Sequence, residues 1–313
     1  MCIRDRIVTD KEGCTAEEKV FVFVNDCRKA QNSSEVNYIS LQAKVLLQGA
    51  KKEGEALMHD QLRAKKLLPL IEPYTALSPY LNVASPFKHI RGGLAEIAPD
   101  VLKTEGSNAI VDWVFLELRW DQDPSKVLAT RSALLQRDGD IVDIDGISPV
   151  RFLIPEDRYF VAVRHRNHLG AMSATAVSFS PTAAIDFTDK TESFYTLTGT
   201  SESSKFPMVL INGYNYLWGG NSNGDNKIIF QGPNLDREKI LFDTALHPDN
   251  TAVNYNFIYN GYLMGDNNMD GLMIFQGSDN DVDELQFFNV LLHEENPRNL
   301  PNKIIFEQLP RKE

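Results

Sequence analysis

Alternating apolar and polar residues, broken by Gly- and Asp-containing turns, run through the region from Tyr38 to Thr188. Strands that follow one another without intervening helices predict an antiparallel β-sandwich rather than a βαβ fold. The Asp-Gly pair at 138–139 stands between two such runs and predicts a hairpin. One stretch, Glu53 to Leu68, has the spacing of a helix. The expected strands are 43–48, 109–119, 127–136, 141–144, 158–166 and 174–180.

A shorter β pattern stands at the N-terminus. Ile7 to Thr15 and Val20 to Val24 predict a strand, a turn and a second strand. This hairpin is too short to fold alone, so residues 1–28 are interpreted as the remnant of a domain whose front is missing. Residues 1–6 fit nothing that follows and are excluded as an artefact. Residues 30–35 are expected to form a linker.

Length and charge narrow the classes of function. A chain of 313 residues with 42% apolar residues is long enough for two or three domains. It has no run of about 18 uncharged apolar residues, so no membrane span is expected. The net charge of −11 argues against a nucleic-acid partner, because such binding starts from clustered Lys and Arg. Cations suit this chain better than anions.

The acidic excess gathers near the C-terminus, where the sequence repeats. Gly219 to Asn296 holds thirteen acidic and three basic residues, which accounts for nearly the whole net charge. Shifted by 45 residues, 221–238 aligns with 266–283, and seven of the eighteen positions are identical. After a one-residue slip, His247 aligns with His293. The tail is therefore interpreted as a duplicated module.

The second copy carries the spacing of a calcium loop. Calcium takes six to eight oxygen ligands, and side chains at positions 1, 3 and 5 with a carbonyl at position 7 supply about half of them. Asp266, Asn268 and Asp270 have this spacing, with the carbonyl of Leu272 at position 7. Gly271 at position 6 allows the turn. We expect a calcium site here.

The first copy offers a weaker version of the same loop. Its candidate ligands are Asn221, Asn223, Asp225 and the carbonyl of Lys227, with Asn226 at the turn. Apart from Gly, Asn is among the residues that most readily adopt a positive φ. Because only one of the first three ligands is a carboxylate, we expect this site to bind calcium less tightly.

Both copies depart from an EF-hand at the closing position. Position 12 is Gly232 in one copy and Gly277 in the other, and neither has a side-chain oxygen. Acids follow shortly afterwards and open apolar stretches of helical spacing, where an Asp is a plausible N-cap. The loops are therefore expected to close on these acids after a short insertion. The closing candidates are Asp236 and Glu238 before the helix 240–246, and Asp281 and Asp283 before the helix 285–292.

These residues carry a resemblance to a family. The tail resembles the paired calcium loops, related to dockerin modules, at the C-terminal end of large secreted and cell-surface proteins of gliding-type bacteria. Leu-Leu-Gln-Gly-Ala at 46–50 and Arg-His-Arg-Asn-His-Leu-Gly at 164–170 are similar to segments of the same proteins. Residues 155–163 resemble prealbumin-like and Cna-B-like sandwich modules, and the N-terminal hairpin resembles the last two strands of a PKD-type repeat.

The resemblance implies a mainly β chain with three parts. An immunoglobulin-like or prealbumin-like β-sandwich is expected at 38–188 and a connecting segment at 189–216. A small α+β, EF-hand-like (dockerin-like) calcium module is expected at 217–313. The N-terminal remnant would belong to a PKD-type or immunoglobulin-like domain.

The sandwich region and the tail contain further candidates for a functional site, namely two histidines and three tryptophans. On a strand, His165 and His168 point to opposite faces, which favours a structural or loop-anchoring role over zinc or general-base chemistry. Trp113, Trp120 and Trp218 are the candidates for a sugar platform, although Trp113 lies in an apolar strand and fits the core better.

No enzymatic signature stands out. Asp143 and Asp145 share a strand face and are the one candidate catalytic pair, yet alternating surface acids are much commoner. A Ser/His/Asp motif, a His-Glu-x-x-His motif and a phosphate loop are all missing from the sequence. The sequence therefore predicts no catalytic site.

The expected function is that of a non-catalytic, calcium-binding region of an extracellular or cell-surface bacterial protein. It would serve adhesion, assembly or display, with an unknown protein or glycan partner. A chain that begins inside a domain has lost its true N-terminus, so the missing signal peptide does not count against secretion. The alternative is an accessory appendage, dockerin-like or carbohydrate-binding, of a secreted hydrolase whose catalytic domain lies upstream.

Overall fold

The structure is a computed structural model that describes residues 2–9, 15–22, 38–77, 85–91 and 93–311. The chain is mainly β and divides into two compact units, 1–37 and 38–313. The stretches predicted as separate domains, 38–188 and 217–313, thus lie together in one unit. Of the helices within the described ranges, none is long and apolar enough to cross a membrane.

The first unit contains a two-stranded hairpin. Strands β1 (Cys2–Thr9) and β2 (Thr15–Val22) are antiparallel, with Cys2 opposite Val22 and Thr9 opposite Thr15. The two predicted strands are present, whereas the turn predicted between them lies outside the described residues. Strand β1 also includes residues 2–6, which the sequence analysis left out of the fold. The predicted linker at 30–35 lies outside the described residues.

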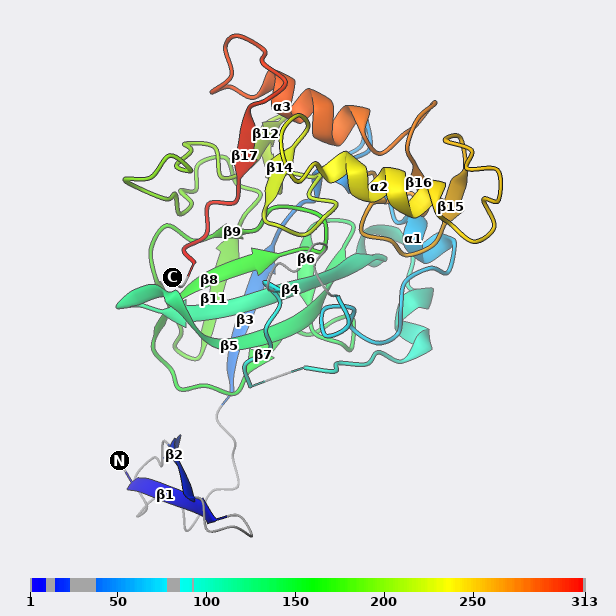
Figure 1. Cartoon of the computed structure of the whole chain (residues 1–313). Coiled ribbons are helices and arrows are strands. Elements are labelled where there is room, and N and C mark those ends of the chain that lie inside the picture. The colour runs from blue at the N-terminus through cyan, green and yellow to red at the C-terminus, as the bar shows by residue number, and fades with distance from the viewer. Residues whose placement is uncertain (1, 10–14, 23–37, 78–84, 92, 312–313) are drawn as a thin grey trace. The chain divides into compact units, whose positions relative to one another are not determined.

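One nine-stranded sheet organises the second unit (Figure 1). Its order is β10-β8-β4-β5-β6-β3-β11, with β7 beside β3 and β9 beside β8. Among the described pairs of this sheet, neighbours are antiparallel except for the parallel pair β3 and β11. The strands are β3 (Ile39–Lys44), β4 (Ile110–Trp120), β5 (Asp123–Gln136), β6 (Asp140–Val142), β7 (Val150–Phe152), β8 (Arg158–Arg164), β9 (Ala171–Met172), β10 (Val177–Ser178) and β11 (Thr182–Asp186).

The sheet curls until its two ends meet. Strands β10 and β11 stand at opposite ends of the strand order, yet only the three residues 179–181 join them. A chain of this length spans roughly 13 Å, so the ends must lie close together. The enclosed core contains the fully buried side chains of Trp113, Phe115, Phe152 and Phe187. The predicted Asp-Gly hairpin joins β5 and β6 as expected.

The helix predicted from Glu53 to Leu68 is mostly wrong. Only α1 (Gln61–Ala64) forms, and it ends in a turn that sequence spacing does not reveal. Lys66 takes a positive φ of 60°, and the amide of Leu67 donates to the carbonyl of Leu62 at 2.8 Å. These are features of a Schellman motif, which stops a helix. Short 3-10 turns make up the other local helices: η1 (Gln48–Ala50), η3 (Pro99–Lys103) and η4 (Gly106–Asn108).

The tail is built from two copies of one unit whose short strands are exchanged. After the hairpin of β12 (Val209–Ile211) and β13 (Tyr214–Tyr216), the first copy contains β14 (Lys227–Ile229), α2 (Asp236–Ala245) and β15 (Ile258–Asn260). The second contains β16 (Leu272–Ile274), the π-helix η5 (Asp283–Phe288), α3 (Asn289–Leu292) and β17 (Ile304–Phe306). Strand β14 pairs with β17, and β15 pairs with β16.

The π-helix explains the one-residue slip between the copies. A π-helix has one more residue per hydrogen-bonded turn than an α-helix, so it takes up a single inserted residue. Asp236 and Asp281 are 45 residues apart, whereas His247 and His293 are 46 apart. The insertion therefore falls between them, where α2 is regular and η5 is not.

Each tail helix packs against strands rather than against the other helix. Ile240 of α2 belongs to an apolar cluster with Met273 of β16. Val290 of α3 belongs to a separate cluster with Ile228 and Ile305, from β14 and β17. The two helices thus have separate apolar partners, and the segments 257–263 and 303–309 contribute Tyr259, Leu263 and Ile305 to these clusters. Leu246, at the end of α2, and Phe288 and Leu292, in the second helix, are exposed.

Candidate metal centre

The two acidic loops share the hydrogen bonds of their third and fifth residues and the positive φ of their sixth. We call residues 221–227 loop 1 and residues 266–272 loop 2. In loop 1, Asn223 accepts the amide of Asp225 and Asp225 accepts the amide of Lys227, both at 3.0 Å. The sixth residues, Asn226 and Gly271, have positive φ values of 65° and 83°, as expected from the turn chemistry. The equivalent bonds in loop 2 run from the Asp270 amide to Asn268 at 3.0 Å and from the Leu272 amide to Asp270 at 2.7 Å.

One buried carboxylate closes each loop, fifteen positions after its start. Asp236 accepts the amides of Asn223 at 3.4 Å and Ile229 at 2.7 Å. Asp281 accepts the equivalent amides of Asn268 at 3.2 Å and Ile274 at 2.8 Å. Each carboxylate thus ties the start of its loop to the strand that follows.

The sequence predicts these carboxylates as helix N-caps, but in the structure neither of them caps its helix. The residue before α2 is Leu235, no side chain caps that helix, and Asp236 is already its first residue. The other two acids do not reach the loops either. Glu238 follows Asp236 by two helical residues, about 200° around the axis. Asp283 is exposed and accepts a bond from Asn280 at 2.9 Å. The structure places Asp236 and Asp281 at the loops, whereas Glu238 and Asp283 as ligands stay a prediction.

Burial makes the closing carboxylates hard to ionise. Desolvation raises the pKa of Asp236 and of Asp281 well above the ordinary range, and the nearby charges of Asp225 and Asp266 raise them further. The pKa of Asp266 is raised to about 7 by burial, against the opposing charge of Arg166. A bound cation offsets such a desolvation cost, which makes these groups suitable metal ligands.

The donor set is made of oxygens, which fits calcium. Carboxylate, amide and main-chain oxygens are the ligands that calcium prefers, and no His or Cys stands among the predicted positions. In loop 1 the Asn221 Oδ1 atom is buried without a hydrogen-bond partner, an oxygen in need of a donor or a cation. In the described parts of the chain, no three His, Cys, Asp or Glu side chains are placed to hold a metal by themselves. A calcium ion would draw on the amides and carbonyls as well.

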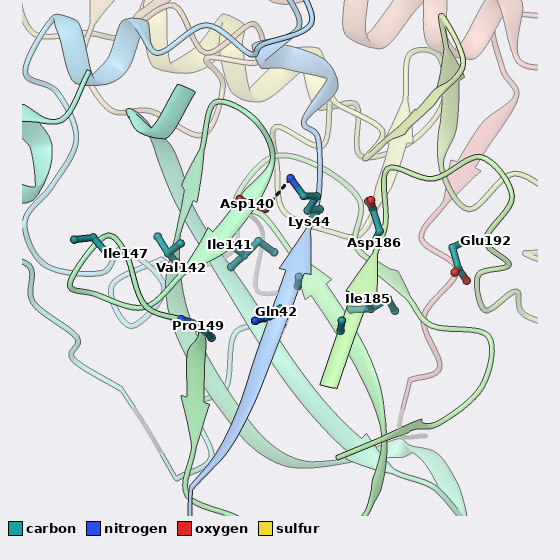
Figure 2. Close-up of a pocket in the computed structure, with 12 residues that line it drawn as sticks. Gln42, Lys44, Asp140, Ile141, Val142, Ile147, Pro149, Ile185, Asp186 and Glu192 are labelled. Atoms are coloured by element: carbon teal, nitrogen blue, oxygen red, sulfur yellow. Dashed lines mark ion pairs between the residues drawn. The ribbon is translucent and has the colours of Figure 1, made fainter. Parts of the chain in front are cut away.

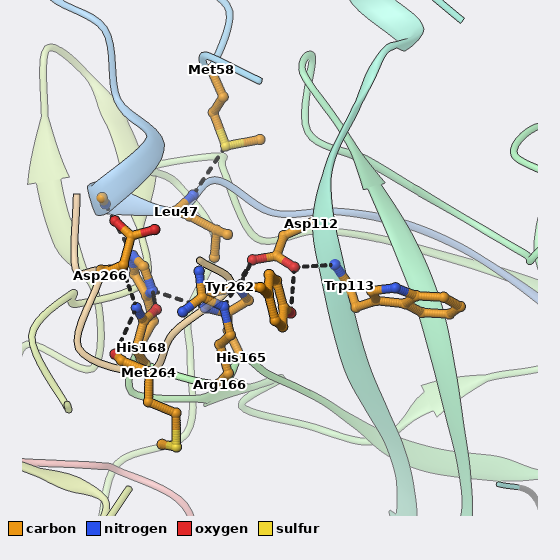
Figure 3. A network of polar contacts seen from close by, with 12 residues as sticks. Leu47, Met58, Asp112, Trp113, His165, Arg166, His168, Tyr262, Met264 and Asp266 are labelled. Atoms are coloured by element: carbon orange, nitrogen blue, oxygen red, sulfur yellow. Dashed lines mark hydrogen bonds and ion pairs between the residues drawn. The ribbon is translucent and has the colours of Figure 1, made fainter. Parts of the chain in front are cut away.

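The sheet anchors both loops through the segment after β8. Asn167 donates from its side chain to the carbonyl of Asp266 at 2.7 Å, and its own carbonyl accepts the amide of Asn221 at 3.1 Å. Arg166 contacts Asp112 at 3.1 Å and stacks over the ring of Tyr262 at 4.5 Å (Figure 3). The loop-anchoring role predicted for this segment is what the contacts show.

The two histidines do not point to opposite faces, because β8 ends at Arg164. His165 and His168 meet through their Nδ1 atoms at 2.9 Å (Figure 3). Burial lowers the pKa of both. His165 Nε2 faces Asp112 at 3.1 Å and so carries its proton, which leaves Nδ1 as an acceptor for His168. His168 Nε2 then accepts the amide of Gly49 at 3.0 Å. This chain of neutral rings fixes structure.

The sequence analysis did not identify the residues that join the sheet to the tail or the two loops to each other. A buried ion-pair network links β4 and β8 to the C-terminal segment: Arg164 contacts Glu117 at 3.0 Å and Glu307 at 2.8 Å. Ser222 Oγ donates to Asn267 Oδ1 at 3.1 Å between the loops. Such pairs are far apart in sequence, and no local pattern marks them.

Two cavities lie near polar side chains. One of about 710 Å³ borders loop 2, and its lining includes Asn268, Asp270, His59, Lys51 and Gln48. The other, of about 460 Å³, lies over β3, β6 and β11 (Figure 2). There Lys44 and Asp140 form an ion pair at 2.8 Å, so each satisfies the charge of the other.

The remaining sequence candidates have structural roles. Trp113 and Trp218 are buried, and only Trp120 is markedly exposed, so the three do not form a sugar platform. Asp143 accepts the amides of Ile144 and of Arg151 in β7, and Asp145 accepts those of Ile147 and Ser148.

Comparison with protein-family models, curated proteins and solved structures gives no match to this chain.

Proposed function

We propose that this chain is a non-catalytic, calcium-binding region of a secreted or cell-surface bacterial protein. It consists of an immunoglobulin-like or prealbumin-like sandwich joined to a duplicated EF-hand-like, dockerin-like module, after a hairpin like that of a PKD-type domain. Its role is adhesion, assembly or display. The observation that carries this proposal is the agreement of loops 1 and 2, bond for bond, around the buried carboxylates of Asp236 and Asp281.

Calcium supplies stability in this proposal. The loop carboxylates repel one another and lose hydration in the fold, and a calcium ion compensates for both effects. Binding only to the folded state stabilises it by about 2.7 kcal/mol at a concentration 100 times the Kd. For a chain of this size that raises Tm by roughly 4–5 °C.

The test is calorimetry of the full chain with and without calcium, together with a calcium titration. Asp281→Asn is expected to abolish binding at loop 2, and Asp236→Asn at loop 1. The matched controls are Asp283→Asn and Glu238→Gln, which lie two residues further along and outside the loops. An unchanged Tm on addition of calcium, or equal effects of the variants and their controls, contradicts the proposal.

The second candidate is an accessory, carbohydrate-binding appendage of a secreted hydrolase. The cavity beside loop 2 supports it, because Asn268 and Asp270 line both the cavity and the calcium loop. Glycan-array binding that requires calcium and is lost in Gln48→Ala would favour this function. Sequencing the whole gene that encodes this chain would tell an adhesin from an enzyme appendage directly.

Neither candidate includes catalysis by this chain. His168 and His165 are engaged with Gly49 and Asp112, so neither ring is available as the base of a nearby nucleophile. A screen against glycoside, ester and peptide substrates should show no turnover. Turnover that disappears in His168→Ala would overturn this assignment.

A further inference from the structure

Asn167 lies outside both repeats and touches the first residue of each loop. It is fully buried, three residues beyond the end of β8. Its Nδ2 atom donates to the carbonyls of Asp266 at 2.7 Å and Met264 at 3.1 Å, on the loop 2 side. Its carbonyl accepts the amides of Gly220 at 3.2 Å and Asn221 at 3.1 Å, on the loop 1 side.

The orientation of the Asn167 side chain is fixed by His168. Because His168 Nε2 accepts the amide of Gly49, its Nδ1 atom carries the proton. That proton faces both His165 and the Oδ1 atom of Asn167, the latter at 2.8 Å. The amide nitrogen of Asn167 must therefore point to loop 2, and a flipped amide would place two like groups against each other.

The start of loop 1 has little room to move independently. A Cβ on Gly220 would stand 2.1 Å from the carbonyl oxygen of Leu285, so the second repeat lies directly against this backbone. Gln286 donates to Ser222 at 2.7 Å, which adds a side-chain bond between the second repeat and loop 1. A shift of either loop start therefore displaces Asn167 or its partners.

We propose that Asn167 is a positioning residue that couples calcium binding at the two loops. This inference rests on the proposed function. An ion at loop 2 fixes the Asp266 backbone and with it Asn167, which then holds the Asn221 amide where loop 1 needs it. Part of the free energy needed to order loop 1 has then already been supplied, so the ion at loop 1 binds more tightly. Asn167 itself contributes no ligand.

The experiment compares the affinity of each loop with the other loop filled or disabled. Asp236→Asn leaves loop 2 alone, Asp281→Asn leaves loop 1 alone, and calcium titration of these variants and the parent chain gives the coupling. We expect a coupling of about fivefold or more in the parent chain. Asn167→Ala should reduce it to near onefold while both ions still bind.

The matched control is Asn250→Ala. Asn250 is also buried and also donates to two carbonyls, those of Thr244 and Asn254, but both lie in one repeat. It should lower stability and leave the coupling unchanged. Equal coupling in the parent chain and in Asn167→Ala overturns the inference and leaves the proposed function standing. A parent chain that binds no calcium overturns the proposed function itself.

A second measurement needs no change at Asn167. In Asp236→Asn, calcium enters loop 2 only, and hydrogen exchange reports the amides of Gly220 and Asn221, which donate to Asn167. Their protection should rise by about fivefold or more when calcium is added. Unchanged protection of these two amides means that loop 2 does not act on loop 1 through Asn167.

Discussion

Ser222 and Asn267 hold the same position in the two loops and are hydrogen bonded to each other, Oγ to Oδ1 at 3.1 Å. A contact between equivalent residues is what a pseudo-twofold arrangement of the repeats requires. The exchanged pairing of β14 with β17 and of β15 with β16 agrees with it. The two loops therefore meet through the side chains of their second residues and are not independent appendages.

Asp270→Ala should weaken calcium binding at both loops. Asp270 is the fifth residue of loop 2 and orders the Leu272 amide at 2.7 Å. We expect a loss of about tenfold or more at loop 2 and about fivefold at loop 1, because the loops share ordering cost. Calcium titration measures both. The exposed Asp249→Ala serves as the control, and a loop 1 affinity unchanged by Asp270→Ala would refute the coupling.

The loops could be predicted from sequence because their geometry is local. Asn268 accepts the backbone amide two residues further along the chain, and Gly271 adopts a positive φ easily because it has no side chain. The 45-residue repeat also showed which residues of the two loops are equivalent. The slip between His247 and His293 was a visible signal of an inserted residue, and the structure places that insertion in η5.

The contacts around the loops could not be predicted in this way. Asn167 meets Asp266 across 99 positions, and nothing in the local pattern selects that partner. The same holds for β14, whose pairing strand β17 belongs to the second copy rather than the first. The end of the helix expected at 53–68 could not be predicted, because it depends on the backbone of Lys66, a residue of ordinary helical propensity.

Calcium stabilisation should grow as the pH rises. The pKa of Asp266 is raised from 3.8 to about 7, so the calcium-free fold holds a proton there that calcium must displace. The stability given by that proton is present below pH of about 4 and lost as the pH rises through about 7. The difference in Tm with and without calcium should therefore increase between pH 5 and pH 8.

Asp266→Asn is the matched variant for this experiment, because loop 1 carries Asn221 at the same position. It removes the titrating group, and the dependence of the calcium effect on pH should become flatter. Asp283→Asn should keep the slope of the parent chain. A calcium effect that is the same at pH 5 and pH 8 in the parent chain would argue against metal binding at Asp266.

Glu307→Gln should destabilise the whole second unit. Both carboxylate oxygens of Glu307 lie 2.8 Å from Arg164, and one of them accepts the Gly170 amide at 2.9 Å. Removing one partner of a buried ion pair leaves a buried charge uncompensated and costs about 3 kcal/mol. Urea unfolding measures the loss. Glu294→Gln, an exposed position in the same tail, should change the free energy of unfolding by less than about 0.5 kcal/mol.

Gly49→Ala should damage loop 2 from the side of the sheet. A Cβ at this position would stand 2.0 Å from the carbonyl oxygen of Asn267, so the backbone of loop 2 must move. The Gly49 amide is held by His168 at 3.0 Å, which prevents Gly49 from moving instead. We expect a loss of about 2 kcal/mol in the free energy of unfolding and a larger loss of calcium affinity at loop 2 than at loop 1.

Gly261→Ala is the control for this substitution, since its Cβ would meet only the Leu263 side chain, at 3.4–3.7 Å, an ordinary van der Waals distance. It should leave both affinities near those of the parent chain. Chemical unfolding and calcium titration of the two alanine variants give the comparison. If Gly49→Ala loses stability but lowers the two affinities equally, then the strain at Asn267 spreads through the shared backbone, and loop 2 is not selectively positioned by the η1 turn.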